Sequence, residues 1–106
     1  MNGPAVDRFV LVAPLKPDSR RRAEALLAEH SALGVGELET AFDRHAIYLS
    51  ETEVIFLFEG RGAHEAVRAL FNDPVRSTLI GHWLPLFDGP LHQAPEAYLW
   101  ERQRDG

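Results

Sequence analysis

The sequence contains no cysteine. This absence excludes disulfide bonds, thiolate metal sites, cysteine nucleophiles and iron–sulfur clusters. Basic residues are also few, since 11 Lys and Arg stand against 16 Asp and Glu, which gives a formal net charge of -5. This balance disfavours a general attraction to the phosphates of nucleic acid or to anionic lipid. Any chemistry must use other side chains, and we expect neither nucleic acid nor a membrane as a partner.

Long apolar runs are missing as well. No stretch approaches the roughly 20 apolar residues that span a bilayer, and residues 1–7 lack an apolar run after a basic region. We therefore expect a cytoplasmic protein. A chain of 106 residues with 45% hydrophobic composition fits one small domain. We expect this domain to cover residues 1–106, with a flexible leader at 1–7 and a flexible tail at 102–106.

The most informative segment that is present is the apolar run Val54-Ile55-Phe56-Leu57-Phe58. Side chains of a strand alternate between the two faces of a sheet, so here both faces are apolar. In a chain this short, one layer of helices can cover one face only, and the other face needs a second layer. The simplest source of that layer is a second copy of the chain, so the sequence predicts a homodimer.

Periodicity and turn residues predict the order strand, helix, strand, strand, helix, strand. Strands are expected over 8–13, from about 39 to 49, over 53–59 and over 94–100. The first helix is expected after Pro17-Asp18-Ser19, and the second helical region is expected over 63–71 with a further helical piece over 74–84. The first helix is expected to end at Gly34 and Gly36. This order is the α+β ferredoxin-like arrangement, a four-stranded antiparallel sheet with both helices on one side. The other side carries large apolar residues and favours association of two sheets.

This layout resembles the dimeric α+β barrel superfamily over Arg8 to Glu101. The superfamily includes antibiotic-biosynthesis-type monooxygenases, small polyketide cyclases, stress-responsive barrel proteins and haem-degrading relatives. The spacing of Phe42, His45 and Tyr48 is similar to one in the small polyketide cyclases, and residues 97–100 resemble their aromatic final strand. Residues 52–60 and 82–90 resemble bacterial barrel proteins without an assigned reaction. The resemblance implies a homodimer with a ligand cavity in each subunit, between the sheet and the helices.

His45 and Tyr48 are candidates for acid–base chemistry, because an imidazole exchanges protons near pH 7 and a phenol donates a hydrogen bond to a carbonyl or enolate. Three residues apart on a strand, they are expected on opposite faces unless a bulge intervenes. The alternative is that both satisfy structural hydrogen bonds. Arg44 within a strand must reach solvent, a partner or a cavity, and in a cavity it would stabilise an oxyanion.

His82 lies beside Trp83 near the end of the second helical region. The superfamily often lines its pocket there, and its haem-binding members place an iron ligand there. In the alternative interpretation, Trp83 fills the core and His82 flanks the end of a helix. The five histidines form no ligand motif, and no glycine-rich segment has phosphate-binding or dinucleotide-binding spacing. We therefore expect neither a metal nor a cofactor.

The leading hypothesis is a homodimer that binds a small hydrophobic ligand, with cyclisation or oxygenation of an aromatic or polyketide-like substrate as the candidate reaction. His45 or His82 would move the proton and Arg44 would stabilise the oxyanion. The candidate substrate-binding residues are aromatic: Tyr48, Phe56, Phe58, Trp83, Tyr98 and Trp100. One alternative is a noncatalytic interaction protein whose interior is filled by its own side chains, and another is a haem-binding barrel protein.

Overall fold

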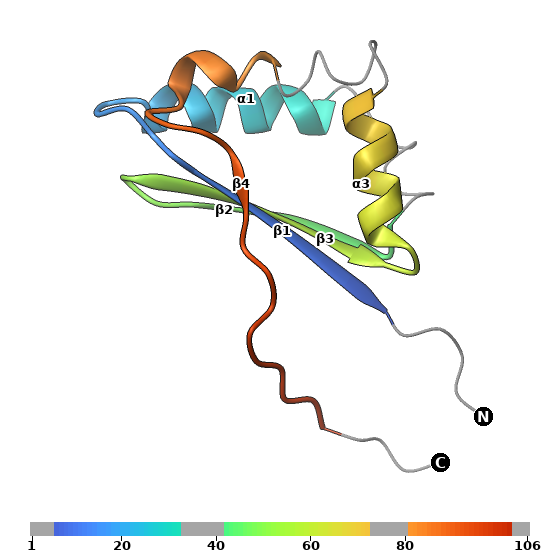
Figure 1. Cartoon of the computed structure of the whole chain (residues 1–106). Helices are drawn as coiled ribbons and strands as arrows, with labels where there is room; N and C mark the ends of the chain where they lie inside the picture. The colour runs from blue at the N-terminus through green and yellow to red at the C-terminus, as the bar shows by residue number, and fades with distance from the viewer. Residues whose placement is uncertain (1–5, 33–41, 73–80, 103–106) are drawn as a thin grey trace, which may run out of the picture.

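The computed structural model describes residues 6–32, 42–72 and 81–102 (Figure 1). Its elements follow the chain as strand β1 (Asp7–Pro14), helix α1 (Arg20–Ala32), strand β2 (Arg44–Leu49), strand β3 (Glu53–Gly60), helix α3 (Ala63–Asn72), the 3-10 helix η1 (Leu84–Leu86) and strand β4 (His92–Gln93). The strands form one antiparallel sheet in the order β2-β3-β1-β4. This confirms a small α+β fold compatible with the ferredoxin-like arrangement.

Helices α1 and α3 lie on the same side of the sheet, and no described element covers the other side (Figure 1). The strand register shows which side chains share a face of the sheet, and their burial shows which face meets the helices. Leu11 of β1 lies opposite Phe56 of β3, and Ala13 lies opposite Val54. All four are buried, as are Phe58 of β3 and Val67 of α3. The core thus lies between the helices and this side of the sheet.

Residues after the second helical region close this core. Trp83 is 1% exposed and its ring meets the ring of Phe56 edge-on, at a centroid distance of 5.3 Å. Leu86 and Phe87 are buried beside it in the same cluster. Trp83 therefore fills the core, as the alternative interpretation of this residue expects. The expected helix over 74–84 falls mostly on residues outside the described ranges.

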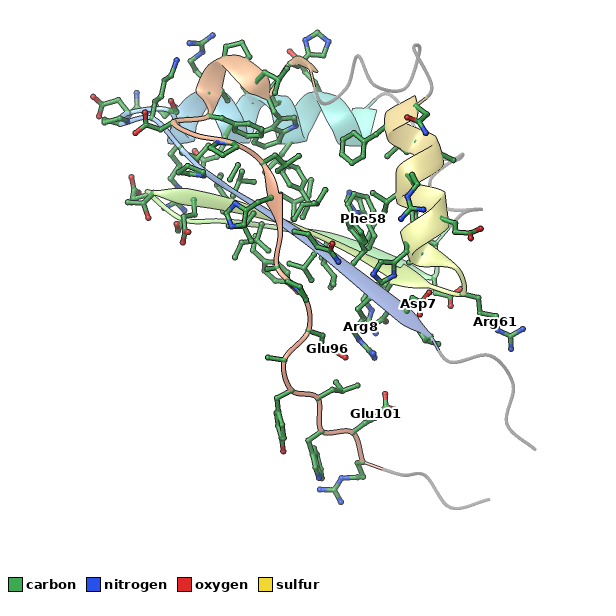
Figure 2. The ribbon with its side chains drawn as sticks, viewed as in Figure 1. Asp7, Arg8, Phe58, Arg61, Glu96 and Glu101 are labelled. Atoms are coloured by element: carbon green, nitrogen blue, oxygen red, sulfur yellow. The ribbon has the colours of Figure 1, made fainter. Side chains whose placement is uncertain are left out.

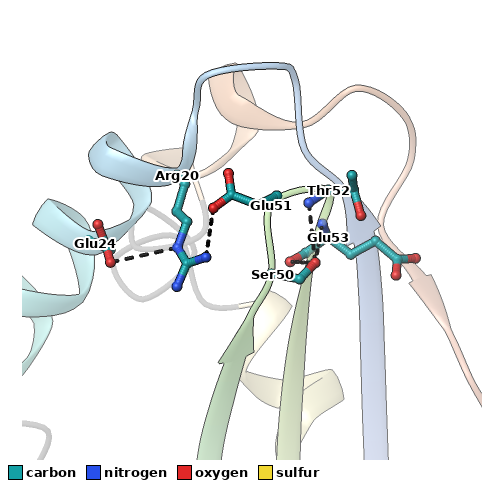
Figure 3. Close-up of polar contacts among 6 residues, drawn as sticks. All are labelled: Arg20, Glu24, Ser50, Glu51, Thr52 and Glu53. Atoms are coloured by element: carbon teal, nitrogen blue, oxygen red, sulfur yellow. Dashed lines mark hydrogen bonds and ion pairs between the residues drawn. The ribbon is translucent and has the colours of Figure 1, made fainter.

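A tight turn of Ser50, Glu51 and Thr52 joins β2 to β3, so the two strands predicted on either side of it form a hairpin. The Ser50 hydroxyl oxygen accepts hydrogen bonds from the backbone amides of Thr52, at 3.2 Å, and Glu53, at 3.0 Å (Figure 3). A serine side chain that bonds backbone groups within two or three residues stabilises a turn over continued strand. Strand β2 begins at Arg44, later than the expected start near 39, and residues 39–41 lie outside the described ranges.

The fourth strand is not where the sequence predicts it. Strand β4 is His92–Gln93, and residues 94–102 form no strand, so the predicted strand over 94–100 is wrong. The amide of Ala94 still donates to the carbonyl of Val10, at 2.9 Å, but the next residue is Pro95, which has no N–H to donate. The chain therefore leaves the sheet at Pro95. We call residues 95–102 the C-terminal arm.

The turn before α1 contains a residue in the left-handed region. The amide of Ser19 donates to the carbonyl of Lys16, at 3.2 Å, and Asp18 has φ 64°. Pro17 followed by a residue with positive φ is the arrangement of a type II turn, which favours glycine at the Asp18 position. Ser19 then precedes the first helical residue, and its carbonyl accepts from the amide of Ala23.

Replacing Asp18 with glycine should stabilise the protein. The left-handed region costs an L residue ~1–2 kcal/mol, and the greater unfolded-state freedom of glycine offsets about 0.5–1 kcal/mol of that gain. We therefore expect Asp18→Gly to raise the free energy of unfolding by about 0.5 kcal/mol, measured by urea denaturation. Lys16→Gly, in the same turn without a positive φ, is the control and should lower it. Equal losses in both variants would contradict the strain argument.

Candidate functional site

The uncovered side of the sheet, which we call the open face, is apolar along its middle. Strand alternation places on this face the residues that lie opposite one another in the register: Val10, Val12, Ala46, Ile55 and Leu57. All five are partly exposed, whereas their helix-facing neighbours on β1 and β3 are mostly buried. Tyr48 extends this strip on the edge strand β2, where it lies opposite Ile55 and is 55% exposed.

One end of the open face is charged. A carboxylate oxygen of Glu59 lies 2.7 Å from Nε of Arg8, and its other oxygen lies 3.8 Å from Nε of Arg44. The Glu59 side chain is 13% exposed, whereas that of Arg44 is 69% exposed. Arg8 also lies 3.9 Å from Glu96 and 3.8 Å from Glu101 of the C-terminal arm (Figure 2). Arg8 is therefore surrounded by carboxylates, while Arg44 presents most of its side chain to solvent.

His45 lies on the other side of the sheet from Arg44 and Tyr48, as the three-residue spacing predicts. It pairs with Phe58, which faces the helices, and its ring stacks on the Phe58 ring at a centroid distance of 4.5 Å. Nδ1 of His45 lies 2.9 Å from the carbonyl oxygen of Leu57. A carbonyl only accepts, so Nδ1 carries the proton and donates it. His45 and Arg44 thus project to opposite faces and do not converge on one point.

The aromatic candidates fall into separate places. Phe56 and Phe58 are 5% exposed and, with Trp83, belong to the core on the helix-facing side. Tyr98 is 81% exposed and Trp100 is 66% exposed, both on the C-terminal arm. The structure therefore brings together Phe56, Phe58, Trp83 and His45 on one side of the sheet. It places Arg44 and Tyr48 on the other side.

His82 is exposed, although its neighbour Trp83 is buried. Groups of three or more His, Asp or Glu placed to hold a metal ion do not occur within residues 6–32, 42–72 and 81–102. Over the same ranges, no helix has the length and apolar character needed to cross a membrane.

Sequence reasoning missed Glu59 and Arg8. The signal was available, because Glu53 and Glu59 flank the apolar run with the same parity as Ile55 and Leu57. Charged residues avoid a buried face, so their parity marks the face that points away from the core. Arg8 has the matching parity on β1 and lies opposite Glu59.

A separate hollow lies between α1 and the hairpin turn. It has a volume of about 540 Å³ and is lined by Asp18, Arg20, Arg21, Glu24 and Glu51. Arg20 lies 2.8 Å from Glu51 of the hairpin turn and 3.7 Å from Glu24, one helical turn further along α1 (Figure 3). Because Arg20 pairs with both carboxylates and all three side chains are exposed, these contacts are solvated ion pairs, which contribute little to stability.

Comparison of the chain with protein-family models, with curated proteins and with solved structures gave no match. The resemblance to the dimeric α+β barrel superfamily therefore depends on the layout of helices and strands. The structure bears out the α+β layout with a four-stranded antiparallel sheet. Association of two chains and the binding of a ligand are proposals.

Proposed function

We propose that the protein is a homodimer that binds a small hydrophobic or aromatic molecule between the open faces of two copies. The observation that carries this proposal is the composition of the open face. Apolar side chains form its middle, and a few polar groups, Tyr48, Arg44 and the Arg8–Glu59 pair, stand at its margin. Apolar walls with a small number of placed polar groups are typical of small-molecule sites.

Assembly of two chains supplies the missing layer. The helices lie on the other side of the sheet (Figure 1). Contiguous exposed apolar surface of this kind marks an interaction site in a water-soluble setting. A two-fold axis brings the same patch of both copies together, so one apolar strip meets its own copy. Two stacked sheets lie about 10 Å apart with their side chains interdigitated, so a ligand would lie at the polar margin of the strip, beside Tyr48 and Arg44, where the two sheets diverge.

Arg44 gives the ligand class. Its side chain is 69% exposed and lies 3.8 Å from Glu59, a longer separation than the 2.7 Å of the Arg8–Glu59 pair. Guanidinium groups recognise carboxylates and other planar anions through parallel N–H donors. Together with the phenol of Tyr48, Arg44 favours an aromatic or hydrophobic molecule with one anionic or phenolic end.

Binding is proposed here in place of a reaction. The candidate mechanism needs His45 to move a proton on the substrate atom whose oxyanion Arg44 stabilises. These two side chains project to opposite faces of β2. His82 lies exposed beside the core residue Trp83, and its role in proton transfer or haem ligation stays a prediction, which a haemin titration of His82→Ala would test.

The test combines oligomeric state with binding of the anionic aromatic dye ANS. Sedimentation at micromolar concentration should give the mass of two chains, and ANS fluorescence should report saturable binding. Arg44→Gln should weaken ANS binding about tenfold, because a hydrogen bond to a charged group contributes about 1.5 kcal/mol. Arg68→Gln, which removes the same charge from an exposed position on α3, should not. A stable monomer, or equal effects of both variants, would overturn the proposal.

A noncatalytic interaction protein is the second candidate. The observation in its favour is that Phe56, Phe58 and Trp83 are buried in the core, where they pack against one another and the helices. The same experiment distinguishes the two functions. If the protein is a dimer but Arg44→Gln leaves its ANS binding unchanged, its interior is filled by its own side chains.

A further inference from the structure

The C-terminal arm carries large apolar side chains into solvent. Tyr98 is 81% exposed, Leu99 48% and Trp100 66%. The arm begins at Pro95, where the chain leaves β1, and it extends away from the sheet on the side opposite the helices (Figure 1). The guanidinium of Arg102 lies 5.9 Å from the centre of the Trp100 ring, within the range of a cation–π contact. Three adjacent large apolar side chains exposed together are typical of an interaction site.

The sequence of the arm has the alternating pattern of a strand, although the arm pairs with no strand in the described part of the chain. Tyr98 and Trp100 alternate with Ala97 and Leu99, which is why the sequence predicts a strand there. Along its own chain, Pro95 interrupts pairing with β1, and residues 94–102 form no strand. Arg8 nevertheless directs the arm, because it lies 3.9 Å from Glu96 and 3.8 Å from Glu101 (Figure 2). These contacts with two carboxylates leave Tyr98, Leu99 and Trp100 exposed between them, so the arm is directed while its apolar side chains stay available for docking.

The direction of the arm identifies what it meets. It projects past the open face, into the space where the proposed partner sheet would lie (Figure 1). Stacked sheets are about 10 Å apart, whereas an extended chain of this length reaches about 25 Å. The arm of one copy must therefore pass alongside the sheet of the other.

The partner sheet offers one edge for the arm. Strand β2 is at the end of the order β2-β3-β1-β4, so one of its sides carries backbone groups without a strand partner in the described part of the chain. The other edge is already occupied by β4, from which the arm starts. A two-fold axis that runs along the strands, between the sheets, brings the β4 edge of one copy over the β2 edge of the other.

We propose that the C-terminal arm is an exchange segment that adds to the β2 edge of a second copy, with Tyr98, Leu99 and Trp100 packed against the partner. This inference rests on the homodimer of the proposed function and adds its means of closure. Main-chain pairing with an open strand edge supplies affinity, and the alternating side chains supply register. Each copy gives one arm and receives one, so the contact is closed and forms pairs.

Because the chain has no cysteine, a single introduced cysteine reports one position. The experiment mixes a tagged Ala46→Cys chain, altered on β2, with an untagged Leu99→Cys chain, altered on the arm. A short bismaleimide should join unlike chains. Ala25→Cys, on the exposed surface of α1, is the matched control and should join poorly with Leu99→Cys. If the double variant Ala46→Cys/Leu99→Cys instead cross-links within one chain, the arm folds onto its own sheet and the exchange is refuted.

A second measurement does not depend on cross-linking. Replacing Tyr98, Leu99 and Trp100 together with serine should leave far-UV circular dichroism unchanged and raise the dimer dissociation constant at least about tenfold, since interface energy concentrates in aromatic anchors. An unchanged dissociation constant would overturn the arm exchange while the dimer stands. A wild-type chain that sediments as a monomer would instead overturn the proposed function itself.

Discussion

Trp83→Ala is expected to lower the free energy of unfolding by about 3–5 kcal/mol, which is a large share of the roughly 5–15 kcal/mol that holds a small domain folded. Trp83 is 1% exposed, meets Phe56 edge-on and lies in the same core cluster as Leu86 and Val67. Removing the indole leaves a cavity that the surrounding strands and helices cannot fill without moving. Urea denaturation followed by far-UV circular dichroism measures the change, because the variant also loses a fluorophore.

Leu84→Ala is the matched control for this prediction. Leu84 is the next residue along the chain, but it is 57% exposed. Its replacement should change the free energy of unfolding by no more than about 0.5 kcal/mol. Both variants are compared at one protein concentration, because the proposed assembly would add a concentration-dependent contribution. Similar unfolding midpoints in the two variants would show that the core is not closed by Trp83.

The course of β3 could be predicted from its sequence, and so could the hairpin with β2. A run of β-branched and aromatic residues between polar turns leaves few other structures. An apolar run of this kind does not show which of its alternate residues face the helices, because Val54, Phe56 and Phe58 are as hydrophobic as Ile55 and Leu57. The flanking glutamates resolve this ambiguity, since Glu53 and Glu59 share the parity of the face that points away from the helices.

The error at the last strand has a different origin. The alternation over residues 94–100 shows that the segment suits a half-buried strand. It does not show which strand, of its own chain or of another, would pair with it. Pro95 was the local warning, because a proline is confined to the edge or the first residue of a strand. In the structure, pairing with β1 ends at Ala94 and the remaining alternation has no partner in its own sheet.

The candidate site shows what residue types can and cannot predict. The opposite orientations of His45 and Tyr48 follow from strand geometry and are confirmed by their register partners, Phe58 and Ile55. The grouping of the aromatics does not follow from sequence, because it depends on distant packing. Trp83 meets Phe56 although helix α3 stands between them in the sequence.

Ile55→Glu is expected to dissociate the proposed dimer without unfolding the chain. Ile55 lies in the middle of the open face, opposite Val12 on one side and Tyr48 on the other. In the separated chain its side chain is partly exposed, so a glutamate there reaches water. In a two-fold pair the substitution occurs twice, so the interface loses two buried isoleucines and gains two carboxylates in its apolar layer.

The size of this effect follows from the area removed. Burial of an isoleucine contributes about 1.5–3 kcal/mol, so two copies lose about 3–6 kcal/mol and the dissociation constant should rise at least about 100-fold. Sedimentation velocity at micromolar concentration measures it, and thermal unfolding checks that the separated chain stays folded. Ala25→Glu adds the same charge to the exposed surface of α1 and should leave the dimer intact. If Ile55→Glu sediments as a pair like Ala25→Glu, the chains associate through another surface, and the open face holds neither the interface nor the ligand.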